Sequence, residues 1–379
     1  MNLFKLSLFL LKFDLNYFDV PKEEQERYIN SLGEPKDDWD RSYKQYQCQR
    51  YFNPWWKVCI YNIVSALVFP FYLLLLWVKG FFLKYKTEVD AVGRFKTDPE
   101  VLPEVLTKQY HINNDLWDTG SILSLKDICY LGKYIIRYYY SPRFLLKSMA
   151  KIALYRGIIR QYNPRAIVEC VEFSYTSSLL TDYCHQNGLK HINVMHGEKL
   201  FFMRDSFFHF DECYIWSEFY KQLFTSLKAD PNQFIIAIPP SLKIDIAKYK
   251  NPSVFADYKY YLAEFTEDEI ISISESMDFA RREGKKVIFR AHPRFSNMSV
   301  LKRHIDAAEI EYPKEVNILE SIANADNIIG DFSTTMTQGY FSGKNVIVDD
   351  VTFKDHYKKL KSYGYFLANV DTQKLSQFQ

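Results

Sequence analysis

Residues 165–195, RAIVECVEFSYTSSLLTDYCHQNGLKHINVM, decide the fold class of this chain. The runs RAIVEC (165–170) and HINVM (191–195) are typical of buried β-strands, and the stretch 176–186 between them has the pattern of a helix. A strand, a helix and a second strand in this order predict a β-α-β unit, in which the two strands run parallel. We therefore expect a doubly wound α/β fold.

The same alternation continues toward the C-terminus, with one interruption. Four prolines between 230 and 257 predict the crossover between two halves of the chain. We expect further strands at 214–216, 260–265, 286–290, 316–319, 327–330 and 345–348, and helices at 218–229, 267–283, 299–308, 320–325 and 335–341. The 379 residues are enough for two domains of ordinary size.

The bulk composition argues against several functional classes. The net charge of +2 argues against a nucleic-acid partner. None of the six cysteines has the CxxC spacing of a zinc site or belongs to an obvious disulfide framework, so a reducing compartment is expected. Neither GxGxxG nor GxxxxGK[ST] occurs, so neither a dinucleotide fingerprint nor a P-loop is predicted.

Residues 58–78, VCIYNIVSALVFPFYLLLLWV, form an uninterrupted uncharged run. Its length, and the flanking Trp56, Lys57 and Lys79, fit a membrane segment. Because Pro70 lies inside the run, a kinked helix that dips into one leaflet fits as well as a full span. A buried core helix is the remaining interpretation.

Residues 128–168 contain no acidic side chain but are rich in basic and aromatic ones. The basic residues recur every four to six positions, with tyrosines, Phe144 and two leucines between them. This pattern suits an anionic membrane surface, and a solvated helix face is the alternative.

Three motifs follow predicted strands, at the end of the sheet where open α/β folds bind ligands. The first is His196-Gly197-Glu198, after the strand HINVM. Gly197 permits a sharp turn, and His196 and Glu198 could act as a general base and its orienting partner. The alternative is an ordinary loop histidine beside a solvated carboxylate.

The second and third motifs suit a phosphate group. Arg290, His292 and Arg294 converge in RAHPR, where guanidinium groups and an imidazole could bind phosphate oxygens. The sequence GDFSTT then places four polar side chains before an expected helix: Asp331, Ser333, Thr334 and Thr335. Hydroxyl and backbone N–H groups at a helix N-terminus bind phosphate, although simple capping of the helix would also explain them.

One possible metal motif, Asp38-Trp39-Asp40, lies in the charged N-terminal stretch without a preceding strand. We interpret it as a solvated acidic loop and expect no metal.

Together, the three motifs resemble those of bacterial GT-B glycosyltransferases of surface-polysaccharide synthesis. Sialyltransferases and polysialyltransferases have an HP motif followed by a Ser-Ser/Thr motif, and RAHPR followed by DFSTT is similar to that pair. A Gly-Lys pair and an expected strand come next in this chain. Teichoic-acid glycerophosphotransferases are similar too, and His196-Gly197 resembles their earlier His-Gly motif. The resemblance covers roughly residues 160–350, and the acidic pair followed by glycine of the sialyltransferases is matched only by Glu267-Asp268-Glu269.

The resemblance implies a GT-B-like fold, with a cleft between two Rossmann-like domains. It implies an inverting, metal-independent transferase that uses a nucleotide-activated sugar, a CMP-sugar being favoured, and a glycan or lipid-linked acceptor. His292 with Ser333 and Thr334 would hold the donor phosphate, and His196 or Glu198 would activate the acceptor. We expect no cofactor, an anionic membrane surface as partner, and a location at the cytoplasmic face of the bacterial inner membrane.

The expected organisation is a helical N-terminal region (1–90), an acceptor-side domain (91–235) and a nucleotide-donor domain (236–379). Two other functions remain open. A polyol-phosphate transferase on the same scaffold would form a phosphodiester instead of a glycosidic bond. A non-catalytic scaffold protein of a polysaccharide export complex would not depend on His196 or His292.

Overall fold

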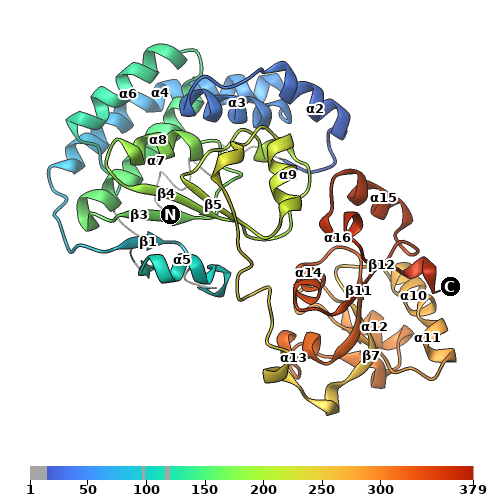
Figure 1. Cartoon of the computed structure of the whole chain (residues 1–379). Helices are drawn as coiled ribbons and strands as arrows, with labels where there is room; N and C mark the ends of the chain where they lie inside the picture. The colour runs from blue at the N-terminus through green and yellow to red at the C-terminus, as the bar shows by residue number, and fades with distance from the viewer. Residues whose placement is uncertain (1–14, 96–98, 115, 117–119, 379) are drawn as a thin grey trace. The chain divides into compact units, whose positions relative to one another are not determined.

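The computed structural model describes residues 15–95, 99–114, 116 and 120–378, which form two α/β units (Figure 1). The first unit contains the described residues up to His196 together with Phe201–Ala237. The second contains Gly197–Leu200 and the described residues from Ile238 onward. Each unit has a six-stranded sheet in which all paired strands are parallel, so the predicted fold class of two Rossmann-like domains is confirmed.

The first sheet has the strand order β2-β1-β3-β4-β5-β6. Its strands are β1 (Ala91–Gly93), β2 (Ile112–Asn113), β3 (Ala166–Glu169), β4 (Lys190–Val194), β5 (Glu212–Ile215) and β6 (Phe234–Ile236). The β-α-β unit predicted from residues 165–195 is present as β3, α8 (Ser177–His185) and β4, with Ala166 in register with Lys190. The strand order changes direction between β1 and β3.

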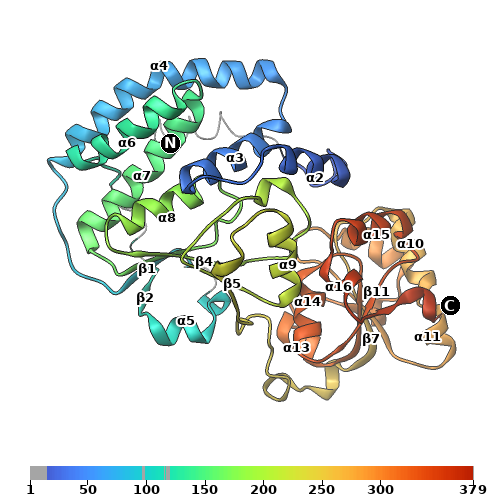
Figure 2. The ribbon, with the colours of Figure 1, turned by 45° about the horizontal axis from the view of Figure 1, so that its top comes forward.

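The helices of the first unit are α2 (Lys22–Ser31), α3 (Asp38–Tyr51), α4 (Trp55–Gly80), α5 (Glu104–Gln109), α6 (Leu125–Tyr138), α7 (Pro142–Tyr162), α8 and α9 (Glu218–Ser226). Figure 2 shows α4, α6 and α7 on one side of the first sheet, with α4 outermost. Residues 1–14 of the expected N-terminal region lie outside the described part of the chain.

Helix α7 corrects one part of our interpretation of residues 128–168 as a membrane surface, because its apolar side chains do not face lipid. Fourteen of its residues are buried, among them Phe144, Leu145 and Leu146, because α7 packs between the sheet and the outer helices. The basic side chains recur with helical spacing, but the apolar ones between them belong to the core. In this stretch the exposed aromatic residues are Tyr139 and Tyr140, just after α6.

The second sheet has the strand order β12-β11-β10-β7-β8-β9. Its strands are β7 (Ala256–Tyr261), β8 (Val287–Arg290), β9 (Ile310–Glu311), β10 (Ala325–Gly330), β11 (Asn345–Val348) and β12 (Gln373–Lys374). Read from β7, this is the doubly wound 3-2-1-4-5-6 order of dinucleotide-binding folds, which reverses between β7 and β10. A ligand is expected in the crevice at the carboxyl ends of the strands beside that reversal.

The helices of the second unit are α10 (Glu267–Ser276), α11 (Asp278–Arg282), α12 (Met298–His304), α13 (Ile318–Ala323), α14 (Thr334–Phe341), α15 (Lys354–Ser362) and α16 (Phe366–Asn369). Short 3₁₀ turns are η1 (Pro99–Val101), η2 (Met203–Asp205), η3 (Pro231–Gln233), η4 (Ala247–Tyr249), η5 (Pro252–Val254), η6 (Ala307–Glu309) and η7 (Leu375–Gln377). The strand expected at 316–319 is wrong: Asn317 caps α13 there through its side chain. The strand expected at 260–265 lies earlier, at β7.

Helix α14 packs unusually close to β10. A Cβ atom on Gly339 would lie 2.5 Å from Ile328 Cδ1, so no larger residue fits without a shift. At the end of β10, a Cβ atom on Gly330 would lie 2.9 Å from Met336 Sδ. Gly330 therefore lets the start of α14 lie close to the carboxyl end of β10, and Gly339 lets the last turn of the helix pack against the middle of the strand.

Candidate active site

His292 lies in the loop that follows β8 and is held by the backbone of its own turn. The Nδ1 atom accepts hydrogen bonds from the backbone N–H groups of Arg294 (3.1 Å) and Phe295 (3.2 Å). Because Pro293 has no N–H, the N–H groups of Arg294 and Phe295 are the first two backbone donors after His292. The Phe295 ring stacks on the imidazole with centroids 4.5 Å apart.

This geometry fixes the tautomer of His292. A ring nitrogen that accepts two N–H bonds carries no proton, so the proton of the neutral imidazole is on Nε2. Burial, and then the charge of Arg294, lower the pKa of His292, which favours that neutral form. In the described part of the chain nothing accepts from Nε2–H, so it can donate to a ligand. Arg294 beside it is exposed and makes no ion pair with a described residue.

Arg290 does not fit the role predicted for it. It is the last residue of β8, it is 5% exposed, and its register partner on β9 is Glu311. Its guanidinium bonds Glu311 Oε1 at 2.5 Å and the Val316 carbonyl at 3.0 Å, and Lys259 pairs with the other Glu311 oxygen at 2.6 Å. Because these buried groups satisfy each other, we remove Arg290 from the proposed phosphate ligands.

The turn after β10 begins α14, as predicted. Ser333 is the N-cap, and its hydroxyl accepts from the backbone N–H of Thr335 at 3.2 Å. Capping therefore explains Ser333, although its O–H can still donate outward. Thr334 is exposed, and the positive end of the α14 dipole lies at this turn. A hydroxyl-rich helix N-terminus is thus placed beside the reversal of the strand order.

Asp331 has a partner that the sequence analysis missed. Its Oδ2 atom is 2.7 Å from Nδ1 of His356 on α15, whereas its Oδ1 atom is buried without a described hydrogen-bond partner. Burial raises the pKa of Asp331, although the bond from His356 opposes that rise. The same bond raises the pKa of His356. A buried carboxylate and a half-exposed histidine therefore adjoin the Ser333 turn.

The His196 motif follows β4, as predicted. Gly197 has a φ of +73°, a conformation that a side chain disfavours. The His196 side chain is exposed, with no described partner. Residues Gly197–Leu200 are grouped with the second unit, where Glu198 Oε2 accepts from the Thr337 hydroxyl of α14 at 3.1 Å. Of the two base candidates, His196 is the one whose side chain is not already engaged.

The Asp38-Trp39-Asp40 motif is the first turn of α3 and not a solvated loop, which corrects that prediction. Asp38 lies 2.7 Å from Nδ1 of His209, and Asp40 accepts from the backbone N–H of Lys36 at 3.0 Å. Over residues 15–95, 99–114, 116 and 120–378, no three His, Cys, Asp or Glu side chains are grouped to suit a metal ion.

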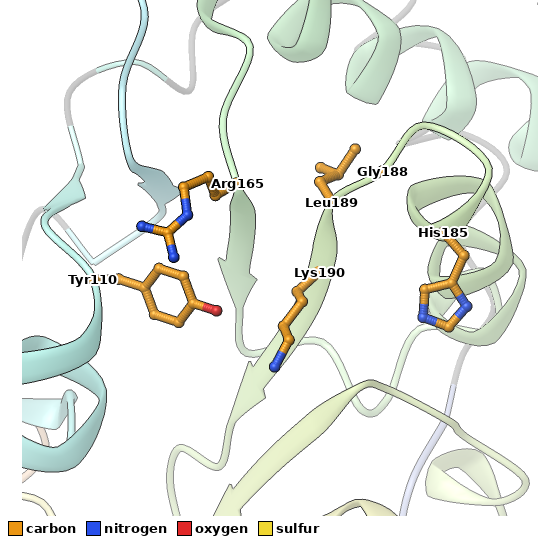
Figure 3. A pocket seen from close by; sticks show the side chains of 6 residues that line it. All are labelled: Tyr110, Arg165, His185, Gly188, Leu189 and Lys190. Carbon is orange, nitrogen blue, oxygen red and sulfur yellow. The ribbon is translucent and has the colours of Figure 1, made fainter.

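A hollow of about 380 Å³ opens at the opposite edge of the first sheet, beside the starts of β3 and β4 (Figure 3). Its lining includes Arg165, His185 and Lys190, which Figure 3 shows around the strand ends. Each is already bonded to a carboxylate: Asp90, Asp211 and Glu212 respectively. Since parallel sheets bind ligands at the other edge, we do not assign the active site here.

The chain was compared with known proteins. No protein-family model matches it, and no curated protein matches it. Among solved structures, it is similar to the wall teichoic acid polymerase TagF (11% identity, 65% of this chain and 72% of that chain, TM-score 0.36). It is also similar to the UDP-GlcNAc 2-epimerase of Methanocaldococcus jannaschii (13% identity, 69% of this chain and 83% of that chain, TM-score 0.38). A third similar structure is a glycotransferase of kitacinnamycin (9% identity, 76% of this chain and 86% of that chain, TM-score 0.43). At such low identities and TM-scores, these similarities assign neither activity nor substrate.

Proposed function

We propose that this protein is an inverting, metal-independent glycosyltransferase of the GT-B type. It transfers a sugar from a nucleotide donor, with a CMP-sugar favoured, to a glycan or lipid-linked acceptor of bacterial surface-polysaccharide synthesis. The observation that carries the proposal is His292, whose backbone-held ring directs an Nε2–H donor outward from the carboxyl end of β8. A preorganised donor of this kind suits the negative charge that develops on a departing phosphate.

In the proposed reaction, the acceptor hydroxyl attacks the anomeric carbon while the bond from that carbon to the phosphate oxygen breaks. The nucleotide leaves with the bonding electrons, and the hydroxyl proton passes to a base. We assign His196 as the base and keep Glu198 as the second candidate. His292, Arg294, Thr334 and the N-terminus of α14 with Ser333 and Thr335 stabilise the leaving phosphate.

A panel of nucleotides tests the donor site directly. CMP, CDP, UDP and GDP are each added to the full chain, and the melting temperature is measured, because a ligand that binds only the folded state raises it. We expect the largest rise with CMP and a smaller one in His292→Ala. No rise with any nucleotide would contradict the proposal.

The polyol-phosphate transferase remains the second candidate, because the same donor groups would bind the phosphate of a CDP-polyol. Its product would retain a phosphate, whereas a glycosyltransferase releases all phosphate with the nucleotide. Mass spectrometry of the product therefore separates the two reactions.

We further propose that α4 lies in the plane of the cytoplasmic leaflet and does not span the membrane. One stripe of α4 is buried, including Val58, Tyr61 and Leu76, and it packs against α7. Near one end of this stripe Asn62 bonds the backbone of α7, and near the other the Leu76 carbonyl accepts from Leu123 N–H. A spanning helix would pull these buried partners into hydrocarbon.

The opposite stripe of α4 is apolar and exposed, as expected for a helix half immersed in lipid. Leu67 is 67% exposed and Phe71 is 76% exposed. No acidic residue occurs between Arg41 and Thr87, and the lysines at 57, 79, 84 and 86 flank the helix, which favours anionic headgroups.

Flotation with vesicles of anionic and neutral lipid tests this placement. Leu67→Ser with Phe71→Ser should release the protein into the soluble fraction, because only exposed side chains change. Val105→Ser, an exposed apolar position on α5, is the matched control and should still float. If the intact protein fails to bind anionic vesicles, α4 is not a membrane element.

A further inference from the structure

Helix α7 carries three basic side chains on one face near its start. Arg143, Lys147 and Lys151 are four residues apart, so they lie one above the other along the helix. Three residues connect the end of α7 to β3, so α7 runs back along the sheet and begins at the carboxyl edge. The Tyr175 ring, which follows β3 in the chain, lies 3.8 Å from Lys147 Nζ and confirms that position.

Two of these cations, Lys147 and Lys151, have no carboxylate partner among the described residues. Both side chains are half-buried. Burial, and then the charges of Lys151 and Arg143, lower the pKa of Lys147 to about 7. Like charges that are half-buried together are unfavourable unless an anion joins them.

A further source of positive potential lies at the same place. Tyr175 directly precedes Thr176, the N-cap of the nine-residue helix α8, and Thr176 makes no side-chain capping bond. The N-terminal end of α8 carries a partial positive charge. The start of α8 is buried, and its Leu179 N–H donates to Ser42 Oγ on α3 at 2.9 Å, so it adds positive potential near Lys147 but offers no ligand contact of its own.

The membrane helix of the proposed function adjoins this cluster. The Arg143 guanidinium lies 4.4 Å from the Tyr61 ring centroid on α4, and the Arg143 backbone N–H donates to Asn62 Oδ1 at 3.1 Å. If α4 lies in the leaflet, headgroup phosphates are within reach of the first turns of α7.

We propose that Lys147 and Lys151, with Arg143 beside them, form a binding site for the phosphate group of a lipid-linked acceptor. The inference rests on the proposed function, since it supplies the acceptor site of the same enzyme. The carboxyl edge of the first sheet is the expected ligand edge of that domain, and of the three sequence motifs only His196-Gly197-Glu198, after β4, lies there. That motif contains none of the three cations of α7. Binding would remove the repulsion among the cations and hold the headgroup at the sheet edge.

Calorimetry on the full chain tests the site, with phosphatidylglycerol vesicles as the lipid probe and glycerophosphoglycerol as its soluble headgroup. Both are phosphodiesters, so the probe itself does not titrate near neutral pH. At pH 8 Lys147 is mostly neutral, so binding should take up close to one proton, measured in buffers of different ionisation enthalpy. Lys147→Gln should bind the vesicles about tenfold more weakly, the lower range for a bond to a charged group, and should take up no proton. Lys133→Gln, an exposed lysine on α6, is the charge-matched control and should behave like wild type.

Two results would overturn the inference: equal vesicle affinity in Lys147→Gln and Lys133→Gln, or no proton uptake in the wild type. Binding of glycerophosphoglycerol as tightly as the vesicles, with the same proton uptake, would overturn the lipid assignment. The melting temperature of Lys147→Gln without lipid should equal or exceed that of wild type, because an unpaired half-buried cation is removed. A lower one would make the lost binding a folding defect and overturn the assignment. The rise in melting temperature that CMP causes, measured on the same samples, reports on the donor site separately. A failure of the proposed function would therefore be distinguished from a failure of the lipid-phosphate site.

Discussion

Replacing His292 by asparagine separates the two functions that the structure gives to this side chain. The Oδ1 atom of asparagine occupies the place of Nδ1, so the N–H groups of Arg294 and Phe295 keep their acceptor. The variant lacks the outward Nε2–H. A donor aimed at developing charge is typically worth about 2.7–4 kcal/mol, so kcat should fall about 10²–10³-fold. The free energy of unfolding should change by less than about 0.5 kcal/mol, because the ring is half-exposed.

The complementary variant is His292→Gln, which keeps a distal N–H donor but loses the local acceptor. It should retain more activity than His292→Asn, and the assay is transfer from any accepted donor under saturating conditions. Lys285→Gln, which changes an exposed side chain just before β8 and therefore at the amino edge of the sheet, is the control and should be fully active. Near-wild-type turnover in His292→Asn would refute the role of Nε2–H.

Three more predictions follow from the same unit. His356→Ala should lower the free energy of unfolding by about 1–3 kcal/mol, measured by chemical denaturation, because it leaves buried Asp331 without its partner; an unchanged value would show that the pair is not formed. Because the folded pKa of His356 is raised, its stabilisation is present below pH 6.5 and lost as the pH rises through that raised pKa, so the decline should be missing in His356→Gln; an identical pH profile would contradict this. Activity should persist in excess EDTA, because fixed groups already meet the leaving phosphate; loss that Mg²⁺ or Mn²⁺ restores would make Asp331 the first suspected metal ligand.

The sequence predicts most of the parallel strands because a strand buried on both faces is a continuous apolar run. The apolar runs of β3 (AIVE), β8 (VIFR) and β11 (NVIV) are of this kind. β1, β2 and β12 have only two or three residues, too few for a pattern, and their place depends on pairing with longer neighbours. The error at 128–168 has a different cause: basic residues recur at helical spacing along α7, but the apolar residues between them are buried in the core, and the sequence alone does not show which face of the helix is covered.

The sequence predicts those site residues that come directly after a strand in the chain. It does not predict contacts that depend on how separate elements pack. His292 and Ser333 follow β8 and β10, so their place at the sheet edge comes from topology. Arg290 is the last residue of the strand β8, and only its register with Glu311 on β9 shows that its guanidinium group is already bonded within the sheet. His356 reaches Asp331 through the folding of α15, and Lys147 meets Tyr175 across two elements, so no local spacing indicates either contact.

The central claim is that the chain transfers a sugar from a nucleotide with inversion and without a metal. The most direct measurement incubates the purified full chain with a CMP-sugar and a lipid-linked acceptor in EDTA, and then determines the product linkage by NMR. The account predicts a new glycosidic bond whose anomeric configuration is opposite to that of the donor, with release of CMP. A newly formed phosphodiester between the donor group and the acceptor, or retention of the donor configuration, would contradict it.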